Sequence, residues 1–166
     1  ATDLIASSSQ QILIYRPLVP IHSLRRLHVI VPPRGEFDPG LKHWCRRIAT
    51  LAEQTACRVS VYGEERTLRA VEGAWQAERR SLSADFHKFT PAEGLAGVAA
   101  RTRPDHMAVF VLARRGMPSY HRRLEDIPGQ LERYFSARSW MLIVPAALGS
   151  SSSSADGRNA LTLSDR

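Results

Sequence analysis

Residues 107–123 read MAVFVLARRGMPSYHRR, and this stretch decides the expected fold. Residues 107–113 carry no charge and are mostly bulky and apolar, a pattern typical of a strand buried on both faces of a parallel sheet. The sequence then becomes strongly basic around Gly116 and Pro118. Because ligands of open α/β sheets bind beyond the carboxyl ends of the strands, we expect a binding site in this basic loop.

Four other segments are predicted to be strands, with helices between them. The further strands are expected at residues 27–31, 58–62, 82–86 and 139–144. The helices are expected at residues 38–55, from 64 onward, from 90 onward and at 127–137. Strands that alternate with helices specify a parallel sheet joined by right-handed crossovers. We therefore expect one α/β domain at residues 25–146, a doubly wound five-stranded parallel sheet with helices on both faces.

Two of the helix starts are predicted from capping residues. Asp38 precedes Pro39, which suits an N-cap followed by proline in the first turn. Residues 90–93, Thr-Pro-Ala-Glu, form a capping box for the later helix. Apolar residues recur at helical spacing between Asp38 and about Thr55, so this first helix is predicted to be amphipathic.

The two ends of the chain are expected to lie outside the domain. Residues 1–24 are interpreted as a linker in which Ile12 to Tyr15 can add a short strand, and Pro17 and Pro20 favour an extended segment after it. Residues 147–166 include five consecutive serines and too few apolar residues to offset chain entropy. This segment is predicted to be a disordered tail.

The composition fits a globular protein with an excess of positive charge. Of the 166 residues, 43% are hydrophobic, and the net charge is +7. Such a charge suits an anionic membrane surface, a nucleic acid or an acidic partner, with solvated surface charge as the alternative. Cys45 and Cys57 lack Cys-x-x-Cys spacing and indicate reduced core residues. The apolar runs are far shorter than the ~20 residues that cross a bilayer, so we expect a soluble, cytosolic chain.

The basic loop supplies the candidate binding residues. They are Arg114, Arg115, Gly116, His121, Arg122 and Arg123. Arginine forms bidentate hydrogen bonds with phosphates, so the loop suits an adenine nucleotide, a cyclic dinucleotide or lipid head groups. The alternative is a solvated loop whose arginines keep the domain soluble.

Other kinds of chemistry find little support in the sequence. The six histidines are dispersed without metal-site spacing, so no metal site is predicted. Imidazole titrates near neutral pH, which makes His28 and His121 candidates for pH sensing, against the alternative of ordinary exposed or hydrogen-bonded rings. No nucleophile pair, Walker loop or carboxylate dyad has useful spacing, so we expect no catalytic residues and no enzyme. Basic charge without interleaved exposed aromatic residues also argues against nucleic acid as a partner.

Resemblance to known families adds information that periodicity cannot give. Residues 104–111 (PDHMAVFV) before the basic loop and residues 140–145 (WMLIVP) near the end of the domain resemble the universal stress protein fold. Residues 27–33 (LHVIVPP) resemble the cytosolic carboxyl-terminal region of bacterial monovalent cation:proton antiporters, which exchange sodium or potassium for protons. Residues 12–20 and 127–135 are similar to flanking parts of that region.

The resemblance implies a regulatory domain appended to a membrane transporter. The ion path would then lie in a transmembrane domain of the same full-length chain, and this domain would lie at the cytoplasmic side of the cell membrane. The implied partners are that transmembrane domain, an anionic membrane surface and a second copy in a homodimer. The chain begins with Ala rather than Met, which fits a piece of a longer protein.

The match to nucleotide-binding universal stress proteins is incomplete at the phosphate loop. Those proteins carry Gly-x-x-Gly followed by a later glycine-hydroxyl pair, and backbone amides approach phosphates closely there because glycine has no Cβ. Here Gly116 alone stands in the loop, and Pro32-Pro33 replaces the aspartate that follows the first strand in that family. A stand-alone universal-stress-type nucleotide-binding protein is therefore the alternative function rather than the leading one.

Overall fold

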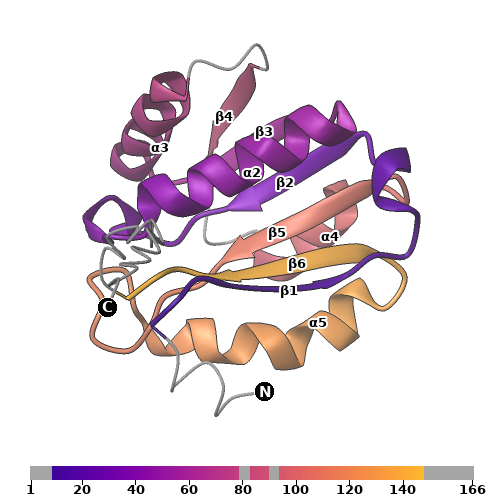
Figure 1. The fold of residues 1–166 in the computed structure, drawn as a ribbon. Coiled ribbons are helices and arrows are strands. Elements are labelled where there is room, and N and C mark those ends of the chain that lie inside the picture. Colours follow the sequence, from indigo (N-terminus) through magenta and orange to yellow (C-terminus); the bar gives the residue numbers. More distant parts are fainter. Residues whose placement is uncertain (1–8, 79–82, 90–93, 148–166) are drawn as a thin grey trace, which may run out of the picture.

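Six strands form one sheet in the computed structural model, which describes residues 9–78, 83–89 and 94–147. The strands are β1 (Ile12–Arg16), β2 (Arg26–Ile30), β3 (Arg58–Gly63), β4 (Ala84–Lys88), β5 (His106–Val111) and β6 (Ser139–Val144). Their order across the sheet is β1-β6-β5-β2-β3-β4 (Figure 1). Strands β2 to β6 are parallel to one another, whereas β1 is antiparallel to its neighbour β6.

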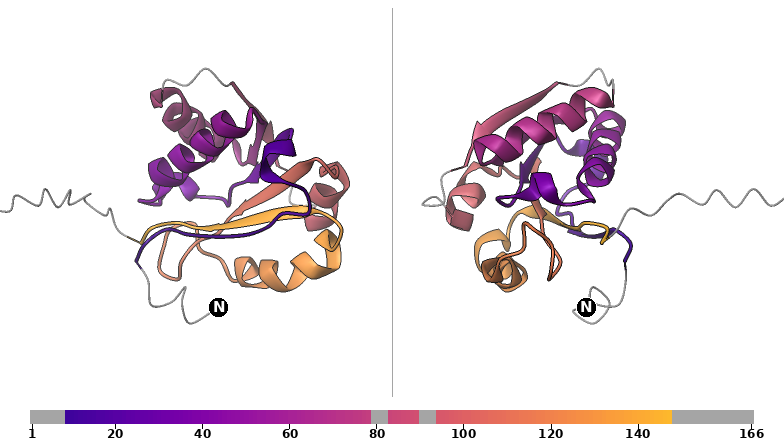
Figure 2. Two further views of the ribbon diagram at one scale, coloured as in Figure 1. Left: turned by 45° about the vertical axis from the view of Figure 1, so that its right-hand side comes forward. Right: turned by 90° about the vertical axis from the view of Figure 1, so that its left-hand side faces the viewer.

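Helices cover both faces of this sheet. The α-helices are α2 (Leu41–Thr55), α3 (Glu65–Ala77), α4 (Gly94–Arg101) and α5 (Ile127–Phe135), and the short 3₁₀ helices are η1 (Ile21–Ser23), η2 (Gly35–Phe37) and η4 (Arg122–Asp126). Helices α2 and α3 lie on one face, and α4 and α5 lie on the other (Figure 2). The chain first winds outward from β2 to β4 and then returns to β5 on the other side of β2, so the fold is a doubly wound, Rossmann-like α/β sheet.

The five predicted parallel strands are all present. The segment around residues 107–113 forms β5, which lies inside the sheet with both faces covered, as its continuous apolar sequence indicates. The prediction for the third strand is confirmed for residues 84–86, and residue 82 lies outside the described residues.

The sheet contains a sixth strand, so the expected count of five was too low. Strand β1 pairs with β6 over five residues, from Ile12 opposite Val144 to Arg16 opposite Trp140. It comes from the segment 1–24, which was interpreted as a linker with a short strand. The sheet therefore begins well before residue 25, the predicted domain boundary. The sequence shows that Ile12 to Tyr15 can be extended, but not which distant edge they pair with.

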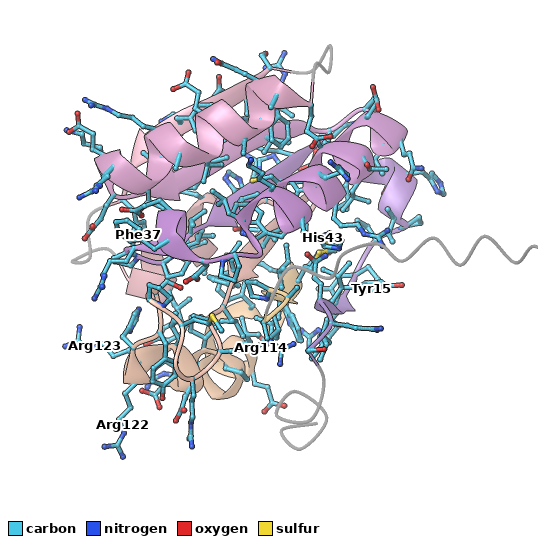
Figure 3. The ribbon with its side chains drawn as sticks, turned by 60° about the vertical axis from the view of Figure 1, so that its left-hand side comes forward. Tyr15, Phe37, His43, Arg114, Arg122 and Arg123 are labelled. Atoms are coloured by element: carbon cyan, nitrogen blue, oxygen red, sulfur yellow. The ribbon has the colours of Figure 1, made fainter. Side chains whose placement is uncertain are left out.

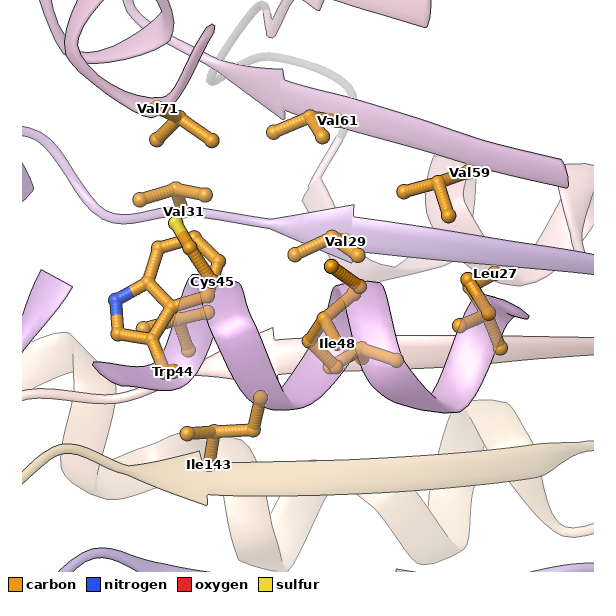
Figure 4. Packing of buried hydrophobic residues seen from close by; sticks show 14 of the residues in the cluster. Leu27, Val29, Val31, Trp44, Cys45, Ile48, Val59, Val61, Val71 and Ile143 are labelled. Carbon is orange, nitrogen blue, oxygen red and sulfur yellow. The ribbon is translucent and has the colours of Figure 1, made fainter. Parts of the chain in front are cut away.

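The larger hydrophobic core lies between the sheet and helices α2 and α3. Trp44, Cys45 and Ile48 project from α2 toward the strands (Figure 4). Their partners in Figure 4 include Leu27, Val29, Val31, Val59, Val61, Val71 and Ile143. Alternate residues of each strand point to this face, as the pleat of a strand requires. The helical spacing predicted for residues 41–52 is confirmed by this packing.

A smaller core fills the opposite face under α4 and α5. Phe110 of β5 and Phe135 of α5 are both fully buried, and their rings meet edge to face with centroids 5.4 Å apart. Leu131 of α5 and Leu142 of β6 complete this contact. The buried strand residues of this core belong to β5 and β6, away from the β4 edge.

One predicted helix cap is wrong. Helix α2 begins at Leu41 with Gly40 as its N-cap, and Asp38 lies before the helix in an extended conformation. Its carboxylate is used elsewhere, as described below. The capping box predicted at residues 90–93 and the tail predicted at 147–166 lie outside the described residues, apart from residue 147. No helix among the described residues is long and apolar enough to cross a membrane.

Candidate functional site

The strand order reverses between β2 and β5, and two loops leave the sheet at this point. Ligands of open α/β sheets bind in the crevice between such loops. Here the loop after β2 and the loop after β5 are joined directly: the backbone N–H of Ser119 donates to Oδ1 of Asp38 at 3.2 Å, and the Ser119 hydroxyl donates to Oδ2. Both side chains are buried. Protein atoms therefore occupy the place where a doubly wound fold commonly holds its ligand.

Arg114 serves the structure of the domain. Its Nε donates to the carbonyl of Pro145 at 2.8 Å, and one of its terminal nitrogens donates to the carbonyl of Gln10 at 2.6 Å. These bonds join the segment before β1 to the segment after β6. Burial lowers the pKa of Arg114, but a guanidinium stays charged at physiological pH. Its donors are directed at backbone carbonyls, so it is a poor candidate for ligand binding.

Arg115 is exposed and paired with Glu125. Its Nε donates to Oε1 of Glu125 at 2.7 Å, and the hydroxyl of Tyr120 donates to the same oxygen at 2.6 Å. The hydrogen bond from Arg115 lowers the pKa of Glu125 and raises that of the guanidinium. Such an exposed pair is weak in water, so Arg115 can exchange Glu125 for an external anion at small cost.

The remaining predicted residues lie at the surface of the same region. Gly116 has a φ of +86°, and a Cβ at this position would meet no atom within 4 Å. Arg122 and Arg123 begin η4 and project outward from the body of the domain (Figure 3). Partial burial, with Arg123 nearby, lowers the pKa of His121. The loop thus presents Arg115, Arg122 and Arg123 to solvent, whereas Arg114 turns inward.

The structure also assembles a polar cluster that the sequence analysis treated as dispersed histidines. Nδ1 of His28 and the hydroxyl of Tyr62 are hydrogen-bonded at 3.0 Å, and Nε2 of His28 and Nδ1 of His106 are hydrogen-bonded at 3.0 Å. His87 stacks on Tyr62 with ring centroids 5.2 Å apart, and the Arg101 guanidinium lies 5.5 Å from the centre of the Tyr62 ring. Four strands and one helix supply these residues.

Burial controls the protonation of this cluster. It lowers the pKa of His28 to about 4, with further lowering by His106, Arg26 and Arg101. Burial also lowers the pKa of His106, although Asp105 opposes the shift. Both rings are therefore neutral at neutral pH, which does not favour the prediction that His28 senses pH near 7.

An open groove of about 520 Å³ lies beside the cluster. It is lined by Tyr62, Phe86, His87, Lys88 and Arg101. Lys88 donates to Glu65 at 2.7 Å, and Arg101 stacks on Tyr62, so both cations of the groove already have partners. The alternation of polar residues along β2, β3 and β4 is the sequence signal that could have located this face, because residues two apart share one side of a strand.

The described part of the chain contains no group of side chains suited to metal binding or to thiol chemistry. No three His, Cys, Asp or Glu side chains there are grouped so that they could hold a metal ion. Cys45 and Cys57 are free and buried. Burial raises the pKa of the Cys45 thiol to about 12, so the nucleophilic thiolate is scarce at physiological pH.

Comparison with known proteins leaves the family of the chain undefined. No protein-family model matches the sequence, and a search of curated proteins returns no significant match. A functional proposal therefore depends on the geometry above and on the sequence motifs.

Proposed function

We propose that this chain is a non-enzymatic regulatory domain of a monovalent cation:proton antiporter, placed at the cytoplasmic side of the membrane. In this role it carries no ions itself. It biases transport by binding an anionic ligand or surface with different affinity in two states of the transporter, because a ligand shifts an equilibrium only through such a difference. The assignment of this domain to the universal stress protein fold is part of the same proposal.

The observation that carries the proposal is the contact between Asp38 and Ser119. This contact joins the two loops at the reversal of strand order, so backbone amides there are not arranged to hold a nucleotide phosphate. Arg115, Arg122 and Arg123 remain outside on the same region. The arrangement favours electrostatic contacts at the surface over enclosed nucleotide chemistry.

Two features of the sequence support attachment to an antiporter. Residues 27–33 and 127–135 resemble the cytosolic region of those transporters, and they form β2 with its following loop and helix α5. Strand β2 belongs to the doubly wound sheet and α5 packs on one of its faces, and the resemblance implies an architecture of this kind.

Binding to lipid vesicles tests the electrostatic part of the proposal. We expect the chain to bind vesicles rich in anionic lipid, and binding to weaken as salt is raised. Replacing Arg122 and Arg123 by Ala should weaken binding roughly 30-fold, since each arginine near an anionic surface contributes about 1 kcal/mol. The matched control replaces Lys42 and Arg47, two exposed cations of α2, by Ala and should bind almost normally. Equal losses in the two variants would contradict a specific role for η4.

Transport measurements test the regulatory part. The gene should continue upstream of residue 1 into several apolar segments of ~20 residues. Deleting this domain from the full-length protein should change the dependence of cation:proton exchange on its effector while exchange itself persists. Tight, saturable ATP binding together with an independent short gene would instead establish the alternative, a stand-alone universal-stress-type nucleotide-binding protein.

A further inference from the structure

Strand β1 has an outer edge that no described residue covers. It is the last strand in the sheet order and pairs only with β6 within the described chain. The N–H of Leu112, just after β5, donates to the carbonyl of Ile143, so the backbone groups of Ile143 point toward β5 and those of Leu142 and Val144 point toward β1. Successive residues of a strand direct their backbone groups to opposite edges. Ile12 and Ile14 lie opposite Val144 and Leu142 and direct their N–H and C=O groups toward β6, so the free backbone groups at the outer edge are those of Leu13 and Tyr15.

Within the described chain, this edge lacks the features that prevent an exposed edge strand from pairing with another chain. Proteins protect edge strands with lysines, prolines, bulges or covering segments. Residues 12–16 include no lysine and no proline, and their one charged side chain is Arg16. Arg16 turns inward: a terminal nitrogen donates to the carbonyl of Phe135 at 2.9 Å and to that of Ser136 at 2.7 Å. Its charge caps α5 and does not guard the edge.

The side chains at this edge are unusually apolar for a surface. Leu13, Tyr15 and Leu18 are 41%, 52% and 48% exposed, and they are three of the four exposed large hydrophobic residues of the described chain. Leu13 and Tyr15 lie on the same face of β1, since they are two residues apart. In Figure 3, Tyr15 points away on the side opposite Arg122 and Arg123. The apolar edge and the basic loop are therefore separate surfaces.

We propose that β1 pairs antiparallel with β1 of a second copy of this chain, with the two-fold axis at Ile14. In this register Ile14 lies opposite the partner's Ile14 as a non-hydrogen-bonded pair, and the free N–H and C=O groups of Leu13 meet those of the partner's Tyr15. Leu13 lies opposite the partner's Tyr15, which forms an aliphatic–aromatic cross-strand pair on each side of the axis. The two sheets become one continuous sheet.

The edge itself favours a second copy as its occupant. A two-fold axis matches a surface only with itself, and Leu13 and Tyr15, on either side of Ile14, are both large and apolar. The axis places Arg16 of each copy opposite Ile12 of the other, so the two arginines lie at opposite ends of the interface. Each copy has a net charge of +7, but the edge of β1 directs no charged side chain outward because Arg16 turns inward. Two copies can therefore approach each other at this edge. An axis at Arg16 would place two arginines opposite each other and include Pro17, which cannot donate to the ladder.

Sedimentation equilibrium on the 166-residue chain tests the proposal. We expect a reversible monomer–dimer equilibrium. Tyr15→Lys should raise the dimer dissociation constant by about tenfold or more, since a lysine at the edge disfavours strand pairing. The matched control is Phe37→Lys, which adds the same charge at a side chain that is 49% exposed on another surface. Circular dichroism shows whether each variant remains folded.

Cross-linking tests the register. In the proposed pairing the two residues at position 14 form a non-hydrogen-bonded pair with Cα atoms about 4.5 Å apart, within the range that a disulfide spans. Ile14→Cys should therefore cross-link two copies under mild oxidation, whereas Leu18→Cys should not, and the native Cys45 and Cys57 are buried. A monomer at every accessible concentration, equal effects of the Tyr15 and Phe37 variants, or cross-linking at 18 but not at 14 would each overturn the proposal.

Discussion

Asp38 joins the two loops that leave the sheet where its strand order reverses. Its carboxylate accepts hydrogen bonds from both the backbone and the side chain of Ser119, and both residues are buried. A buried carboxylate of this kind needs all its partners, because a polar group left without them keeps its desolvation cost. The contact holds the basic loop in place even though the two residues are 81 positions apart.

We predict that Asp38→Asn destabilises the domain. The amide keeps one acceptor but places an N–H₂ group against a donor of Ser119, so the free energy of unfolding should fall by about 1–3 kcal/mol. Urea denaturation followed by tryptophan fluorescence measures this. The control is Asp126→Asn, because Asp126 is exposed and forms no side-chain cap. It should change stability by less than about 0.5 kcal/mol. Equal effects would show that the contact with Ser119 has no stabilising role.

His28 makes the stability of the fold depend on pH on the acidic side. Burial lowers its pKa to about 4 in the folded state, against 6.5 for an unperturbed ring. Between these values the unfolded chain binds more protons, so the folded state loses stability as pH falls from about 6.5 to about 4. Above about 6.5 the full stability is present, because the ring is neutral in both states.

We predict that His28→Gln flattens this acid dependence. The chain should lose about 2 kcal/mol between pH 7 and pH 4 through this ring, less than the full shift implies because the ring keeps some solvent contact. The variant should lose correspondingly less, although it is less stable at pH 7 without the bonds to Tyr62 and His106. Thermal denaturation across this pH range measures the slope. His43→Gln, at an exposed position of α2, should keep the wild-type slope. An unchanged slope in His28→Gln would contradict the assignment.

At the scale of elements, the start of α2 packs directly against the end of β6. A Cβ on Gly40 would lie 2.8 Å from Cβ of Pro145 and 3.0 Å from the backbone nitrogen of Ala146. The backbone of Gly40 itself is ordinary, with a φ of −82°. Glycine is therefore required here by the approach of another segment, not by a special backbone conformation.

We predict that Gly40→Ala and Gly73→Ala have opposite effects on stability. Alanine at 40 forces α2 away from β6 and should lower the free energy of unfolding by about 1–3 kcal/mol. Alanine at 73, in exposed open space on α3, should raise it by about 0.5–1 kcal/mol because alanine favours a helix over glycine. Chemical denaturation of both variants gives the comparison. Stabilisation by Gly40→Ala would mean that the two elements are not in close contact.

Helix α5 and strand β1 support each other in a similar way. Arg16 of β1 donates to two carbonyls at the carboxyl end of α5, where a positive charge is favourable. The same guanidinium lies 6.0 Å from the centre of the Trp140 ring on β6. These contacts fix a strand of only five residues against the domain.

At the scale of the whole molecule, two surfaces of different chemistry lie apart. The basic loop offers charge for an anionic partner, and the β1 edge offers free backbone groups and apolar side chains for a second copy. A dimer joined at β1 would present two basic loops at once. Two linked weak sites bind an extended anionic surface much more tightly than one.

The sequence alone determined the local elements and the fold class. The apolar run of β5, the helical spacing in α2 and the alternation of strands and helices depend on neighbouring residues, so they could be predicted. The basic loop was also located correctly, with Arg115, Arg122 and Arg123 at the surface.

Only the tertiary structure decided which distant residues meet. It directed Arg114 to the carbonyls of Gln10 and Pro145, gave Asp38 a partner in Ser119, and paired β1 with β6. It also brought His28 and His106 together across neighbouring strands. The physical reason is that periodicity fixes the direction of a side chain relative to its own element, whereas its partners depend on strand order and register, which local sequence patterns do not encode.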